Sequence, residues 1–292
     1  MVTLEHAIYA LASKLFKPII EQLPVFERLT DDLRRAHMRI IKEQWAGLVT
    51  LIGVSAFIIA FAFGIFATFL SKSPLAYLAF AFIIAAAIGL VAAAVTFYYP
   101  ATIAGDRKKK IENSLPFAAI YLNTISRSGF PPHTLFKMLA RFKEYGEVAV
   151  EANRINNDVE GLGMDLPTAL ARAIYRSPSN EWTELLAGMR TTIIIGGDLG
   201  QYLTERTKGV VASYRRRLND YSNFLQLLIE VYITLVIVGT IFFIVTTSIM
   251  VAIGGIPVAL VKALNYAVVL LGLPALTAAF ILIIKGVSPT EE

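Results

Sequence analysis

Few side chains in this sequence have a type and spacing that could carry out chemistry. The chain has 3 histidines and no cysteine, and His6, His37 and His133 lie far apart. Zinc and haem sites need several ligands close together, so neither centre is expected. The lack of cysteine also excludes disulfides, thiolate metal sites and cysteine nucleophiles. We therefore expect a protein that is not an enzyme and that binds no cofactor.

The segment Gly196-Gly197-Asp198-Leu199-Gly200 is the nearest approach to a phosphate-binding loop. Such a loop follows a strand in dinucleotide-binding proteins, whereas a helical pattern precedes Gly196. No G-x-x-x-x-G-K-[ST] segment occurs, which excludes nucleotide binding by a P-loop. The pattern favours a hinge or a tight packing point at these glycines. The same role is predicted for Gly129, Pro131 and Gly163, at breaks between helices.

Glu230 is the one carboxylate inside a long apolar run. An ionisable group within a membrane span is a functional candidate by default. Glu230 follows Tyr221 by only two turns, so its side chain could instead reach the cytoplasmic headgroup layer. The first two apolar runs carry no charge that could pair with it, which favours a structural role at the interface over a proton or ion site.

Basic residues are the most prominent charged feature. Two clusters adjoin apolar runs, and we expect them to set the topology and contact anionic lipid, at about 1 kcal/mol per charge. An acidic face of a cytoplasmic partner is the alternative. The clusters are Arg107, Lys108, Lys109, Lys110 and Arg215, Arg216, Arg217.

A second basic set lies farther from the apolar runs in the sequence, and a protein partner is the better interpretation there. This set consists of Arg127, Arg141, Lys143, Arg172 and Arg176. Nucleic acid is not expected as a partner, because residues 101–223 contain 17 basic and 13 acidic residues in dispersed positions.

These residues lie between apolar runs long enough to cross a membrane. With 56% apolar residues and a mean hydropathy of +0.61, the chain is too apolar for an ordinary soluble protein of 292 residues. Four runs are near or beyond the roughly 20 apolar residues that a spanning helix needs. They cover residues 46–70, 75–100, 224–253 and 258–284. We predict an all-α polytopic membrane protein with four spans.

The distribution of Lys and Arg predicts the topology. Residues 1–45 hold seven and residues 101–223 hold seventeen, whereas Lys72 stands alone in the first short connection and Lys262 stands alone near the start of the fourth run. By the positive-inside rule, both termini and the central domain share the cytoplasmic side of the cytoplasmic membrane. The predicted order is cytoplasmic amphipathic helices (1–45), two spans (46–100), a cytoplasmic helical bundle (101–223), two spans (224–284) and a cytoplasmic tail (285–292).

Two helices are expected before the first span. Residues 4–15 have apolar residues at helical spacing and predict an amphipathic helix that ends near Pro18 and lies either in the membrane interface or on the protein's own surface. A second helix is predicted to take Thr30 as its N-cap and to run through His37 to Trp45.

The central domain has the pattern of about six helices and no strand. Gly163 closes one helix, and N-caps are predicted at Asp165, at Ser177 or Ser179, and at Asp198. The last helix shows no break from residue 199 to residue 250, about 75 Å at the usual rise. Such a rod could transmit motion between the bundle and the membrane.

The order of several short motifs resembles one family. They are Leu115-Pro116 after a basic run, Ser128-Gly129-x-Pro131, Gly163-x-x-Leu166 with Ala169-Leu170, and Gly196-Gly197-x-Leu199 with Leu203, followed by a span. This pattern, over residues 101–250, resembles the type II secretion F domain. That family comprises the platform proteins of type II secretion, type IV pili, Tad pili and the archaellum.

The resemblance implies a bundle that docks a hexameric secretion ATPase, which would power the extraction of pilin-like subunits from the membrane and their assembly into a filament. The F domain occurs once here, as in Tad-type members, whereas many relatives carry it twice. A single copy implies pairing with a second copy or a sister platform protein. Four spans also differ from the three of many relatives. Abundant Ile, Ala and Tyr without Cys suit an archaeal thermophile.

Two other functions fit the sequence less well. A permease subunit driven by a separate ATPase would need polar groups or broken helices along a route, and only Glu230 and the Gly254-Gly255-Ile256-Pro257 turn suggest one. A membrane-embedded enzyme would need clustered carboxylates or histidines at the interface, and the sequence shows none.

Overall fold

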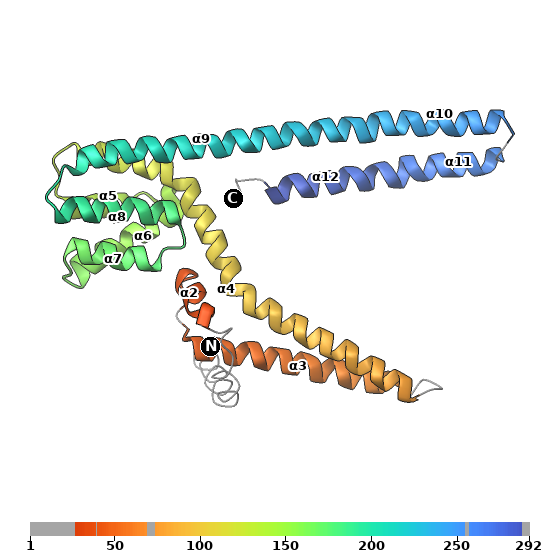
Figure 1. Ribbon diagram of the computed structural model, residues 1–292, viewed down its shortest axis with the longest axis horizontal. Coiled ribbons are helices and arrows are strands. Elements are labelled where there is room, and N and C mark those ends of the chain that lie inside the picture. The colour runs from red at the N-terminus through yellow and green to blue at the C-terminus, as the bar shows by residue number, and fades with distance from the viewer. Residues whose placement is uncertain (1–26, 39, 69–73, 255–256, 288–292) are drawn as a thin grey trace. The chain divides into compact units, whose positions relative to one another are not determined.

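The computed structural model describes residues 27–38, 40–68, 74–254 and 257–287 (Figure 1). Within these ranges every regular element is a helix. Four of the helices are long and apolar enough to cross a membrane: Lys42–Phe66, Leu78–Ser126, Leu199–Ala252 and Val258–Gly286. The prediction of an all-α chain with four candidate spans is confirmed. The chain forms two compact units, residues 1–204 and residues 205–292.

Small residues bring the first two candidate spans close together. Helices α3 (Lys42–Thr68) and α4 (Pro74–Ser126) pack side by side, as Figure 1 shows. A Cβ atom on Gly53 would lie 2.9 Å from the Cβ of Ala93, and one on Gly89 would lie 2.9 Å from the Gly53 carbonyl oxygen. Contacts this short leave no room for a side chain, which is how glycine permits close approach of membrane helices.

Helix α4 continues beyond its apolar part into the helical bundle. It contains Pro100 and Pro116 and is visibly bent in Figure 1, as expected of prolines inside a helix. Beyond Pro100 its buried face repeats at helical spacing: Ile111, Leu115, Ala118, Leu122 and Ile125. One helix therefore carries both the second candidate span and a core element of the bundle.

The bundle consists of α5 (Pro132–Leu139), a 3₁₀ turn (Lys143–Tyr145), α6 (Gly146–Asn156), a π turn (Asn157–Gly161), α7 (Leu166–Arg176), α8 (Asn180–Ile194) and the start of α9 (Leu199–Tyr232). Its largest fully buried side chains are Trp182 and Phe136. The caps at Asp165 and Ser179 are confirmed, because their side chains accept from the backbone N–H of Thr168 and Trp182. Asp198 accepts from the Gln201 N–H at 3.0 Å, as predicted.

The predicted helix from Thr30 to Trp45 is wrong. Thr30 lies inside α2 (Glu27–Arg35), and the next helix begins at Lys42. The backbone N–H of His37 donates to the Arg34 carbonyl and that of Met38 to the Leu33 carbonyl, with His37 at φ +61°. This is a Schellman end with a histidine at the left-handed position, where glycine is usual. The predicted helix over residues 4–15 lies outside the described residues.

The second unit is an antiparallel helical hairpin. Helix α9 passes through a π segment (Ile233–Val238) into α10 (Gly239–Ala252). After a turn, α11 (Val258–Ala267), a π segment (Val268–Gly272) and α12 (Leu273–Val287) return alongside. Tyr232 and Phe280 have ring centroids 5.4 Å apart, and Thr247 Oγ1 donates to Asn265 Oδ1 at 3.3 Å. The predicted unbroken helix is confirmed over Leu199–Ala252, with π geometry in the middle.

Candidate partner-docking site

A buried carboxylate, Glu151 of α6, organises the polar interior of the bundle. Its side chain is 0% exposed and meets three guanidinium groups. The shortest contact is from Arg107 Nη2, at 2.8 Å; Arg176 Nε lies at 3.3 Å and Arg154 Nη1 at 3.4 Å. An isolated buried carboxylate costs several kcal/mol, so these cations are what make its burial tolerable.

Arg107 joins three helices through one guanidinium group. Its Nε and Nη2 both donate to Glu147 Oε2 at 3.0 Å, and its Nη1 donates to the Arg35 carbonyl at 2.6 Å. Helices α2, α4 and α6 are therefore tied together at this side chain. Asp158 extends the network to α7, with Arg176 Nη1 at 3.0 Å and Arg172 Nη1 at 3.6 Å. We call these side chains the Glu151 cluster: Arg107, Glu147, Glu151, Arg154, Asp158, Arg172 and Arg176.

His37 borders the Glu151 cluster as a neutral side chain. Burial, followed by the charges of Arg107, Arg154 and Arg176, lowers the pKa of His37 from 6.5 to about 3. The Nδ1 atom lies 3.7 Å from Glu151 Oε1, which is too long for a hydrogen bond. His37 and Glu151 therefore do not form an ion pair at neutral pH. They carry opposite charges only when His37 is protonated.

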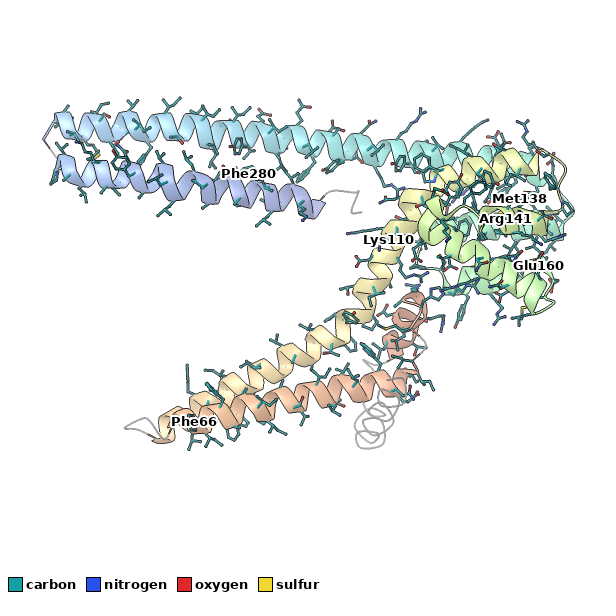
Figure 2. All side chains as sticks on the ribbon, turned by 180° about the vertical axis from the view of Figure 1, so that it is seen from behind. Phe66, Lys110, Met138, Arg141, Glu160 and Phe280 are labelled. Atoms are coloured by element: carbon teal, nitrogen blue, oxygen red, sulfur yellow. The ribbon has the colours of Figure 1, made fainter. Side chains whose placement is uncertain are left out.

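The structure divides the basic residues that the sequence groups together. Arg107 is buried in the Glu151 cluster, whereas Lys109 and Lys110 are exposed on α4 (Figure 2 labels Lys110). Arg172 and Arg176 share Asp158 within the cluster. A contact with lipid stays a prediction for Lys108, Lys109 and Lys110 on α4 and for Arg215, Arg216 and Arg217 on α9.

A basic and aromatic surface is formed by the connection between α5 and α6. Arg141 and Lys143 are exposed there on either side of Phe142, whose side chain is itself 41% exposed (Figure 2 labels Arg141). The Phe142 ring lies 4.9 Å from that of Tyr121 and 6.0 Å from that of Tyr145. Burial raises the pKa of Tyr121 above its usual value of 10.0, so the phenol stays neutral. Rings packed behind two exposed cations suit an acidic protein surface.

Three connections of the bundle turn at glycines in the left-handed region. Gly129, Gly163 and Gly196 have φ of +77°, +68° and +70°, and a Cβ on any of them would meet nothing within 4 Å. Backbone conformation therefore accounts for these glycines. Gly200 is more crowded, since its Cβ would lie 3.2 Å from Asp198 Oδ1 and 3.8 Å from Arg127 Cγ. Hinge roles for these four, for Gly197 and for Pro131 stay predictions, as does a partner contact at Arg127.

Glu230 is exposed on α9 and makes no ion pair or side-chain hydrogen bond within the described part of the chain. Its structural role at the interface stays a prediction. No group of three or more His, Asp or Glu side chains that could hold a metal ion occurs among the described residues.

Sequence reasoning missed the Glu151 cluster, although one signal was present. Glu151 lies one turn from both Val148 and Ile155 on the buried face of α6, and Arg107 extends the buried face of α4 that continues with Ile111. A charge placed on an apolar helical stripe predicts a buried partner of opposite sign. Which charges pair could not be read from spacing, because the partners are 40 and 44 residues apart.

Comparison with known proteins finds one family model that matches part of the chain, including most of the bundle. Residues 118–247 match the family model of type II secretion system (T2SS), protein F, from the last turns of α4 into α10. The uncharacterized protein MJ1286 of Methanocaldococcus jannaschii is 23% identical over 135 residues, which cover 46% of this chain and 23% of that protein. The chain thus spans under a quarter of the length of this curated relative. No solved structure matches.

Proposed function

We propose that the chain is a membrane platform protein of a type IV filament or type II secretion machine, because residues 118–247 match the family model of type II secretion system protein F. The observation that carries the proposal is the position of this domain. The matched residues run without interruption from the bundle into the third candidate span. A platform needs this combination, because it must connect a motor on one side with subunits embedded in the membrane.

In this proposal the bundle, residues 101–223, faces the cytoplasm together with both termini. Supporting this, the bundle holds seventeen of the chain's 27 Lys and Arg residues. The positive-inside rule places such segments on the cytoplasmic side. The protein is then a multi-pass component of the cytoplasmic membrane, with exposed lysines and arginines near the headgroups of anionic lipids.

The energy comes from a partner, a hexameric secretion ATPase, because the chain has no P-loop of its own. The ATPase docks on exposed basic residues of the bundle. Arg141 and Lys143 are the best placed of the predicted set, since neither forms an ion pair within the described residues and Phe142 offers apolar area between them. The Glu151 cluster joins α4 to α6, the helix that follows this surface in the chain.

The cargo in this proposal is a set of pilin-like subunits, extracted from the membrane as α4 and α9 transmit movement of the bundle to the spans. With one F domain, the platform pairs with a second copy or with a sister platform protein. A Tad-type or archaellum-like machine suits the single domain, and the archaeal origin of MJ1286 accords with this assignment.

A deletion strain tests the proposal. Loss of the gene should abolish surface filaments while pilin-like subunits accumulate in the membrane, and a plasmid copy should restore the filaments. A plasmid copy with Arg141→Glu and Lys143→Glu should insert normally but fail to restore them. Normal filaments in the deletion strain would refute the function.

A further inference from the structure

A polar seam runs along helix α9 where it enters the third apolar run. Asn219, Asn223, Gln226 and Glu230 are spaced by four, three and four residues, which is the heptad spacing that keeps side chains on one face of a helix. All four are exposed. From Phe224 onward most of the other residues of α9 are apolar, so the polar residues form a narrow line along an otherwise apolar part of the helix.

Nothing in the described part of the chain satisfies this seam. None of its four side chains makes a hydrogen bond or ion pair there. In the first two spans, the hydroxyls of Thr50, Ser55 and Thr96 bond to carbonyls of their own helices. In the second unit, Asn265 of α11 is already bonded to Thr247. Unpaired amides at the edge of a bilayer are costly, so a partner beyond the described residues would stabilise them.

We propose that the seam is the contact surface between two copies of this chain, with two α9 helices packed in parallel about a two-fold axis. An isologous contact places each residue opposite itself, and Asn and Gln are the side chains that can satisfy themselves, because each amide carries both donors and an acceptor. Polar residues at heptad positions fix the register and number of helices in such a pair.

Glu230 gains a donor in the same arrangement. Successive layers of a parallel pair are adjacent, so the Glu230 carboxylate lies next to the Gln226 amide of the other copy. Glu230, which has no partner among the described residues, is thereby paired at the interface. In its biological role the surface rests on the proposed function, in which a platform with one F domain pairs with a second copy; the contact itself does not depend on it.

The absence of cysteine makes a direct test available, since any introduced cysteine is the only one in the chain. Full-length Asn223→Cys and Gln226→Cys should form disulfide-linked dimers on mild oxidation in native membranes. The neighbours Ser222→Cys and Leu227→Cys, equally exposed but off the seam, are the matched controls and should cross-link at least about ten-fold less. A two-fold seam brings like residues within the few ångströms that a disulfide spans.

A second series tests the amides themselves. With Asn219→Cys as reporter, Asn223→Leu or Gln226→Leu should each reduce dimer formation about three-fold, since an interhelical hydrogen bond in a membrane contributes modestly. Ser222→Leu should have no effect. Equal cross-linking at seam and control positions, no cross-linking at the seam, or cross-linking of the seam to a different protein would each overturn the proposal.

The two experiments distinguish a failure of the pairing from a failure of the proposed function. If seam-specific dimers form in the parent strain and filaments persist after the gene is deleted, the pairing of two copies stands and the platform function is refuted. Absent dimers in a strain that loses its filaments on deletion would refute only the pairing.

Discussion

Arg107 of α4 and Glu151 of α6 form a buried ion pair of 2.8 Å across 44 residues of sequence. The pair joins α4, which contains the second candidate span, to α6, a helix of the bundle outside the candidate spans. The same Arg107 holds the end of α2 through the Arg35 carbonyl. In the platform proposal, these contacts of Arg107 transmit movement of the bundle directly to α4.

Removing the Glu151 carboxylate should therefore destabilise the protein strongly. Glu151→Ala leaves three guanidinium groups without their shared partner, and breaking a buried pair costs about 3–5 kcal/mol. The thermal unfolding midpoint of the purified protein in detergent should fall by about 10 °C. The control is Glu144→Ala at an exposed position, which should change the midpoint little. Equal midpoints for the two variants would mean that the cluster contributes no stability.

Replacing His37 should change the pH dependence of stability. The folded protein keeps His37 neutral down to about pH 3, whereas the unfolded chain takes up a proton below about pH 6.5. Stability from this residue is therefore complete above pH 6.5 and declines as the pH falls toward 3, by at most about 1.4 kcal/mol per unit.

His37→Asn removes this titration, and asparagine tolerates the φ of +61°. Its unfolding midpoint should fall less than that of the unaltered protein between about pH 6.5 and about pH 4. The exposed His133→Asn is the control and should retain the original slope. A parallel decline for all three proteins would contradict the lowered pKa of His37.

The small-residue contact between α3 and α4 can be tested with two glycines of one helix. Gly89→Leu forces a side chain against the Gly53 carbonyl oxygen and should destabilise by about 1–3 kcal/mol. Gly105→Leu meets nothing within 4 Å and replaces a poor helix former, so it should be neutral or stabilising by up to about 1 kcal/mol. Thermal unfolding midpoints that move in the same direction would argue against close packing at Gly89.

Local features of this fold were predictable from the sequence, and long-range ones were not. The four candidate spans follow from the length of the apolar runs. The N-caps at Asp165, Ser179 and Asp198 follow from residue type, because each side chain can accept a hydrogen bond from the backbone N–H three residues later. The end of α2 was missed because His37 occupies a position where sequence rules expect glycine. The Glu151 cluster was missed because its pairs join four separate helical segments, and spacing within one helix says nothing about which charge arrives from another.

Direct binding of a secretion ATPase tests the central claim most plainly. The full-length chain in lipid nanodiscs would be titrated with the purified hexameric secretion ATPase of the same organism. The platform account predicts saturable binding that weakens at least about ten-fold in the Arg141→Glu, Lys143→Glu variant. Lys208→Glu, an equally exposed charge reversal on α9, should retain full affinity. No binding by the unaltered chain, or equal binding by all three proteins, would contradict the account.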